Sequence, residues 1–187
     1  MAASPLDPDP RRLDVSAFSA ARGELAGEWR AETLPRLVAA TLAPADGAPR
    51  HPVAWRASGG RRVLTGAGTQ PSLAIGADTE VTLECQRCLQ PMTLPLHAER
   101  RIFFVAGEDA AAALDTESED DVLALTPALD LRQLIEDELL LALPIVPRHD
   151  HCPAPLPRPF ADPQGAASPA ENPFAALAAL KRDPRPN

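Results

Sequence analysis

The clearest pattern along the chain is an alternation of apolar and polar residues between positions 53 and 104. Side chains at every second position lie on one face of a β-strand, so the alternation predicts an antiparallel sheet with one buried face. The expected buried positions of the central part are Leu73, Ile75, Ala77, Thr79, Val81, Leu83 and Cys85, followed by Met92, Leu94, Leu96, Ala98, Ile102 and Phe104.

Glycine pairs and short polar stretches divide this region into expected strands. Gly59-Gly60 is a favoured two-residue hairpin turn, which predicts that one strand ends there and another begins. Residues 76–78 (Gly-Ala-Asp) can break the next strand in two. Residues 85–91 (CQRCLQP) interrupt the alternation between two apolar runs, so we expect them at the tip of a hairpin.

Helical signals lie on both sides of the predicted sheet. The segment 130–143 has Asp130 as an N-cap, apolar residues at helical spacing, and Pro144 to end it, which predicts a helix packed on the sheet. A short helix is expected within residues 13–27, capped by Asp14. Residues 33–42 fit either a helix or a strand.

Three further segments complete the predicted organisation. Residues 107–121 are acidic and rich in small side chains, which indicates a solvated loop. Residues 153–171 contain frequent prolines and read as a linker. Residues 172–182 predict a short tethered helix that docks on its own domain or on a partner through Phe174, Leu177 and Leu180. We therefore expect an α+β domain over residues 1–152, its antiparallel sheet able to curl into a partial barrel.

Charge and composition narrow the function. No apolar run approaches the roughly 18 residues of a membrane helix, and the N-terminus lacks an apolar signal, so we expect a cytoplasmic protein. The net charge is −8, and the excess of acidic residues is located in the part of the chain after residue 104. Any contact with RNA is therefore expected to be local, and the candidates lie in the neutral N-terminal part: Arg61, Arg62, Arg87, Arg100 and Arg101.

The cysteines suggest a metal site. Cys85 and Cys88 form a CxxC pair, and His149 and Cys152 repeat the same spacing some sixty residues later, so a closed Cys3His zinc set is expected, with His151 as an alternative ligand. Two other interpretations stay open: small buried thiols, or a redox CxxC pair, which normally precedes a helix that lowers its thiol pKa. No Ser-His-Asp order, phosphate-binding glycine loop or HExxH motif is present.

Three blocks in combination, LECQRCLQPMTLPL, DLRQLIEDELLLALPIVPRHDHC and NPFAALAALK, resemble the YceD family of large ribosomal RNA subunit accumulation proteins. The resemblance implies a non-enzymatic factor for synthesis, processing or stability of 23S ribosomal RNA. Such a factor would bind that RNA, a large-subunit ribosomal protein or an assembly factor, and no small-molecule substrate. It also implies a possible metal site. Two alternatives from the residues themselves are a zinc-ribbon-like protein-interaction module without RNA contact and a CxxC thiol oxidoreductase.

Overall fold

The structure is a computed structural model that describes residues 8–44, 47–64, 68–117 and 119–153. These residues belong to one compact unit, Met1–Ala154. The predicted docking helix at 172–182 and nearly all of the predicted linker at 153–171 lie outside the described residues. No described helix is both long enough and apolar enough to cross a membrane.

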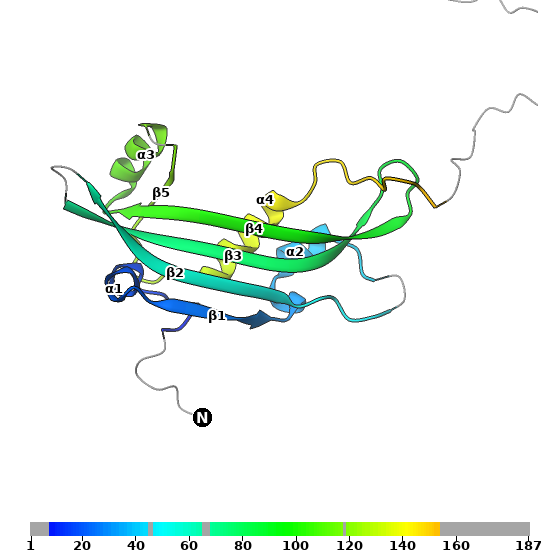
Figure 1. Ribbon diagram of the computed structural model, residues 1–187, viewed down its shortest axis with the longest axis horizontal. Helices are drawn as coiled ribbons and strands as arrows, with labels where there is room; N and C mark the ends of the chain where they lie inside the picture. Colours follow the sequence, from blue (N-terminus) through cyan, green and yellow to red (C-terminus); the bar gives the residue numbers. More distant parts are fainter. Residues whose placement is uncertain (1–7, 45–46, 65–67, 118, 154–187) are drawn as a thin grey trace, which may run out of the picture. The chain divides into compact units, whose positions relative to one another are not determined.

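A five-stranded sheet forms the centre of this unit (Figure 1). Its strands follow chain order: β1 (Glu24–Trp29), β2 (Val53–Leu64), β3 (Gly68–Glu84), β4 (Pro91–Val105) and β5 (Asp121–Ala124). The first four strands pair antiparallel, and β5 pairs parallel to β4. The fold is α+β, as the alternation predicted, and the sheet is open and does not close into a barrel.

Two predicted strand breaks are wrong, because their glycines serve close packing instead of turns. Strand β2 runs through Gly59-Gly60, and a Cβ added at Gly59 would lie 2.7 Å from the carbonyl oxygen of Phe18 in the helix above it. Strand β3 likewise runs through Gly76, where a Cβ would meet the Arg56 guanidinium at 2.6 Å. In both places glycine lets another group approach the strand more closely than any side chain allows.

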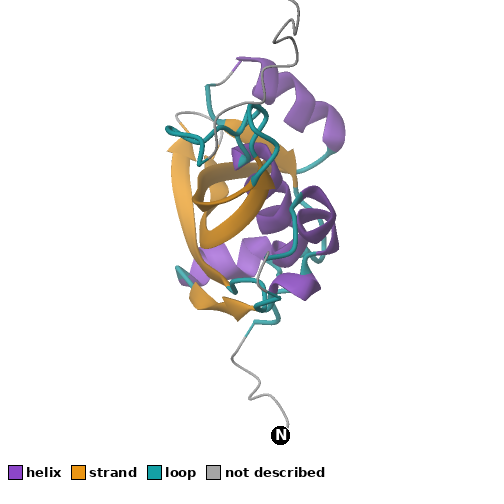
Figure 2. Cartoon of the chain, turned by 90° about the vertical axis from the view of Figure 1, so that its right-hand side faces the viewer, coloured by secondary structure: helices purple, strands orange, loops and turns teal. Residues whose placement is uncertain are grey.

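Most helices cover one face of the sheet and leave most of the other face bare (Figure 2). The covering helices are α1 (Val15–Ala21), the 3-10 helix η1 (Ala31–Thr33), α2 (Pro35–Ala40) and α4 (Leu131–Ala142), whereas α3 (Glu108–Glu117) packs beside Phe103 of the other face, at the β4–β5 edge. Asp14 caps α1 as predicted, but α1 ends at the left-handed Arg22, and residues 24–29 form a strand. The ambiguous 33–42 segment contains helix α2.

Residues 107–121 also differ from the prediction, because they form α3 and lead into β5 instead of a loop. Alanine has the highest helix propensity. Glu108 and Asp109 in the first turn stabilise the helix, because their negative charges lie near the positive end of its dipole. Ala111 is buried beside Phe103 and Val122. Helix propensity and this small apolar contact together outweigh the acidic composition.

Helix α4 holds the covered side together. Asp130 accepts hydrogen bonds from the backbone N–H groups of Arg132 and Gln133, as an N-cap does, and Leu131, Ile135 and Leu139 are buried in the main core. The buried carboxylate of Glu136 accepts hydrogen bonds from the backbone N–H groups of Arg36 and Leu37 at the start of α2. The chain therefore leaves α4 from a fixed position.

Candidate metal centre

The hairpin between β3 and β4 forms a tight turn that carries the first cysteine pair. The backbone N–H of Cys85 donates to the Gln90 carbonyl at 3.0 Å, and that of Leu89 donates to the Cys85 carbonyl at 2.8 Å. Leu89 has a positive φ of 60°, which turns the chain back toward β4 directly after Cys88. Both thiols are thereby held on one small turn.

The second pair arrives on an irregular segment after α4, residues 143–152, which we call the strap. Its prolines prevent the helix from continuing, and the Pro147 carbonyl accepts a hydrogen bond from the Gln86 N–H at 2.9 Å. The His149 N–H donates to the Cys85 sulfur at 3.4 Å. These two bonds place the strap against the hairpin turn, as Figure 1 shows at the far end of β3 and β4.

Cys85, Cys88, His149 and Cys152 converge there, with one ligand atom from each lying within 4.8 Å of all the others. The sulfurs of Cys85 and Cys152 are 4.0 Å apart, and the Cys88 sulfur lies 3.4 Å from His149 Nδ1. Tetrahedral ligands at the ~2.3 Å zinc–sulfur distance would be separated by about 3.8 Å. The donor set and its spacing therefore fit a zinc ion.

The three thiols are free, and none forms a disulfide with another described cysteine. Cys85 is fully buried, whereas Cys88, His149 and Cys152 are half-buried. His151, the alternative ligand, is exposed and lies outside the cluster. The fold therefore brings His149, which is separated from Cys152 by two residues in the HxxC pair, to the cysteines instead of His151.

The surroundings of the cluster favour a negatively charged sulfur at Cys85. Burial by itself would raise the pKa of this thiol, but the backbone N–H groups of His149, Cys88 and Arg87 point at the sulfur, and together they lower its pKa to about 5. For Cys88, burial raises the pKa of the thiol, and the neighbouring sulfurs add to that effect. A metal ion binds the thiolate form of cysteine. The surroundings of Cys85 therefore already favour the form that a metal ion binds.

Arg87 lies between the two cysteines of the first pair and contacts the strap. Its Nε donates to the Cys152 sulfur at 3.0 Å, and its NH2 group donates to the His149 carbonyl at 2.8 Å and the Asp150 carbonyl at 3.3 Å. The hydrogen bond to Cys152 is also the largest cause that raises the pKa of the Arg87 guanidinium. Its place between two cysteines is the one local signal for this role, since two of its partners are backbone carbonyls.

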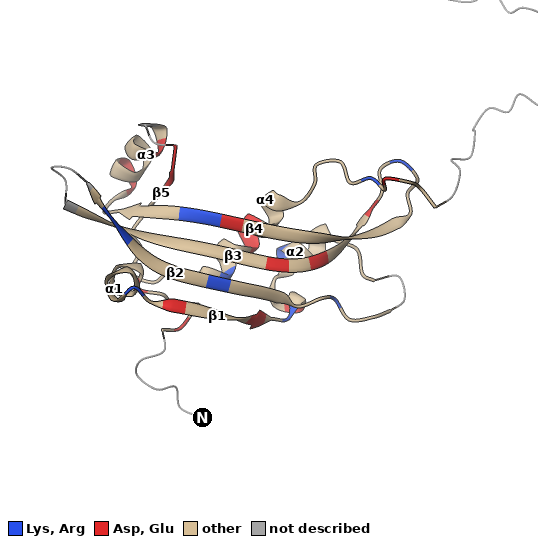
Figure 3. Ribbon diagram, viewed as in Figure 1, with Lys and Arg blue, Asp and Glu red and all other residues tan. Residues whose placement is uncertain are grey.

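The five arginines predicted for RNA binding do not all share one surface, although Arg61, Arg62 and Arg101 line a common hollow. Arg62 stacks on the Phe103 ring at 3.7 Å and pairs with Asp120. Arg100 pairs with Glu138 at 3.0 Å and with Asp121 at 3.2 Å. With Arg87 bound to the strap, Arg61 and Arg101 are the members of the set whose side chains have no hydrogen bond or ion pair among the described residues. Figure 3 shows basic positions on β2, acidic positions on β1 and β3, and both kinds next to each other on β4.

The fold is thus an open α+β sheet whose β3–β4 hairpin and strap bring together a cluster of three cysteines and one histidine that could hold a metal ion. Comparison with known proteins gives the family. The profile of the family described as "Large ribosomal RNA subunit accumulation protein YceD" matches residues 73–181, and the chain belongs to this family.

One curated relative is the large ribosomal RNA subunit accumulation protein YceD of Haemophilus influenzae, which is 38% identical over 107 residues. The alignment covers 55% of this chain and 61% of the relative, so the chain spans about three fifths of the length of the curated protein it matches. No solved structure matches the chain.

Proposed function

We propose that this chain is a non-enzymatic ribosome-biogenesis factor that supports the accumulation of large-subunit (23S) ribosomal RNA in the cytoplasm. The observation that carries the proposal is the family match over residues 73–181, which includes both halves of the Cys3His cluster. A family named for the accumulation of an RNA points to its synthesis, processing or stability within large-subunit assembly. The factor would act by contacting that RNA, a large-subunit ribosomal protein or another assembly factor.

We further propose that the cluster holds one zinc ion through Cys85, Cys88, His149 and Cys152. Three thiolates and one imidazole form a closed tetrahedral set, which leaves no position for a substrate and makes the ion structural. Such an ion would fasten the strap to the β3–β4 hairpin. The arrangement argues against a thiol oxidoreductase, because the first pair faces two further ligands and is followed by a turn and strand β4 instead of a helix.

Cells that lack the gene provide the test. Sucrose-gradient profiles and quantification of 23S relative to 16S RNA should show a deficit of large-subunit particles, which a plasmid copy of the gene restores. A Cys88→Ser copy should restore less, and an Arg132→Glu copy, changed on the covered side of the sheet, should restore fully. Normal 23S levels in the deletion strain under all growth conditions tested would disprove the proposal.

A protein-interaction module without RNA contact is the second candidate, and a specific observation favours it. Three of the five predicted RNA-contacting arginines are bound by groups of the same chain, namely Arg62, Arg87 and Arg100. Most binding to nucleic acid is driven by the release of its counterions when cationic side chains contact the phosphates. Side chains that are already paired within the protein contribute less. Binding of the purified chain to 23S RNA fragments at several salt concentrations separates the two modes.

A further inference from the structure

The bare face of the sheet carries a row of four residues that lie directly opposite one another on neighbouring strands. The strand registers pair Glu24 with Ser58, Ser58 with Ala74, and Ala74 with Arg101, so the row crosses β1 to β4. Its two middle residues are small and its two end residues carry opposite charges. With strand spacings of about 4.8 Å, the backbones of Glu24 and Arg101 are about 14 Å apart.

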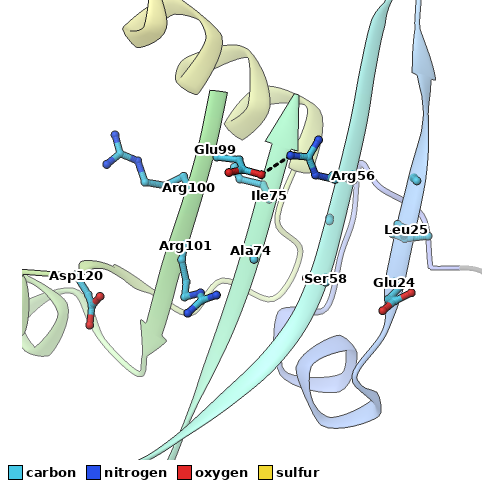
Figure 4. A pocket seen from close by; sticks show the side chains of 12 residues that line it. Glu24, Leu25, Arg56, Ser58, Ala74, Ile75, Glu99, Arg100, Arg101 and Asp120 are labelled. Atoms are coloured by element: carbon cyan, nitrogen blue, oxygen red, sulfur yellow. Dashed lines mark hydrogen bonds and ion pairs between the residues drawn. The ribbon is translucent and has the colours of Figure 1, made fainter. Parts of the chain in front are cut away.

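Larger groups rise on both sides of this row and make it the floor of a hollow, which we call the trough. On one side, Arg56 reaches over Gly76 to pair with Glu99 and with Asp78 at 2.9 Å. On the other side, Asp120 lines the hollow and pairs with Arg62, which lies on the Phe103 ring. Figure 4 shows the Arg56–Glu99 pair and Arg101 at the edges of the hollow, which has a volume of about 840 Å³.

The charges in the trough differ in whether they are satisfied. Arg56, Glu99 and Arg62 on the sides all have partners. Within the described part of the chain, neither the Glu24 nor the Arg101 side chain makes a hydrogen bond or ion pair, and both residues are exposed. The trough therefore presents one free anion and one free cation, on either side of a floor low enough for another chain to approach.

We infer that the trough binds a segment of a partner protein that places a basic side chain at Glu24 and an acidic side chain at Arg101. Complementary charge fixes the orientation of such a segment more than it adds affinity. RNA fits the trough poorly, because its phosphates would approach Glu24, Glu99 and Asp120, and no exposed aromatic ring is available among the described residues of the trough for stacking on a base.

The inference rests on the proposed function for the source of the partner, a protein of the assembling large subunit. The trough itself stands on the cross-strand row and its unpaired ends. A test therefore has to ask first whether a protein occupies the trough, and then which protein it is.

Site-specific photocrosslinking in growing cells answers both questions. A p-benzoylphenylalanine at position 58, on the trough floor, should give a protein adduct that protease removes and nuclease does not. The same probe at position 63, exposed on the opposite side of β2, is the positional control and should not give that adduct. Arg101→Glu and Glu24→Arg should each reduce the adduct at position 58 at least about tenfold, because each places like charges together. Arg132→Glu, which makes the same charge change as Arg101→Glu but on the covered side, should leave the adduct unchanged.

Mass spectrometry of the adduct then names the partner and its segment. Exchanging the acidic residue of that segment for lysine should restore the adduct with Arg101→Glu, which a general loss of folding could not explain. A nuclease-sensitive adduct, an adduct with a second copy of this chain, or an adduct indifferent to both charge reversals overturns the inference. A charge-dependent adduct with a protein unrelated to ribosomes supports the trough and contradicts the proposed function instead.

Discussion

The candidate metal centre and the trough lie on the same sheet, but their polar groups are arranged in opposite ways. At the centre, three thiols, an imidazole and the Arg87 guanidinium all turn inward, and their hydrogen bonds join two segments of one chain. In the trough, Glu24 and Arg101 point outward without partners in the described part of the chain. The difference separates a cluster whose contacts are all within the chain from a surface whose charged ends remain available to a partner.

The largest effect is expected from Cys88→Ser, which removes one ligand from the centre. Loss of a direct ligand should lower zinc affinity by at least about 100-fold, and the midpoint of thermal unfolding should fall by about 10 °C in excess zinc. Elemental analysis and melting curves with and without a chelator measure both. Identical melting of the variant and the wild type in zinc would mean that the cluster does not bind the metal. Ser58→Ala, in the trough, is the control and should leave zinc content unchanged.

Arg87→Ala tests whether the residue holds the strap or contacts RNA. Outer-shell partners of a metal site typically contribute 10- to 100-fold in affinity, so zinc should be lost to a chelator about that much faster. Arg87→Lys keeps the charge without the planar group that contacts three acceptors. Its rate of zinc loss should therefore lie between those of the wild type and Arg87→Ala. Normal zinc retention together with weakened RNA binding would return Arg87 to the role predicted from sequence.

Arg62→Ala asks the same question on the bare face of the sheet. The stacking on Phe103 and the pair with Asp120 should together contribute about 1 kcal/mol, which corresponds to a fall of about 3 °C in the unfolding midpoint. RNA affinity and its salt dependence should not change. Arg61→Ala serves as the comparison, because Arg61 is exposed and has no such contacts, so it should leave the midpoint unchanged.

The smallest effect concerns pH. The hydrogen bond from His97 to Asp78 at 2.6 Å, followed by that from Arg56, lowers the pKa of the Asp78 carboxyl against the opposing effect of burial. A lowered carboxyl pKa stabilises the fold above the ordinary value near ~3.9, and that stability is lost as pH falls through the lower folded value. In Asp78→Asn, the free energy of unfolding should therefore decline less steeply below about pH 4 than in the wild type. The difference should amount to less than ~1 kcal/mol, since the pair is half-exposed. Urea titrations at pH 3 to 7 measure this, and an unchanged acid slope would remove Asp78 from the network.

Local sequence signals predicted those features that depend on short-range geometry. The strand alternation, the capped helix α4 and the matched spacing of Cys85–Cys88 and His149–Cys152 were all visible, because each needs only a few neighbouring residues. Gly59 and Gly76 misled the prediction of strand ends, since Phe18 and Arg56, which approach them, come from elsewhere in the chain. The same limit applies to the arginines: whether a guanidinium is free depends on acids such as Asp120 and Glu138 that only the folded chain brings near it.

The division of the ligand set along the chain has a consequence for how the protein matures during synthesis. Residues 85 and 88 leave the ribosome with the first half of the sheet, but residues 149 and 152 follow only after β4, β5 and α4. A chain that stops early, or whose α4 fails to dock, can present two cysteines and never the complete set of four. The strap can therefore close on the hairpin only after every helix and strand described for this domain has been synthesised.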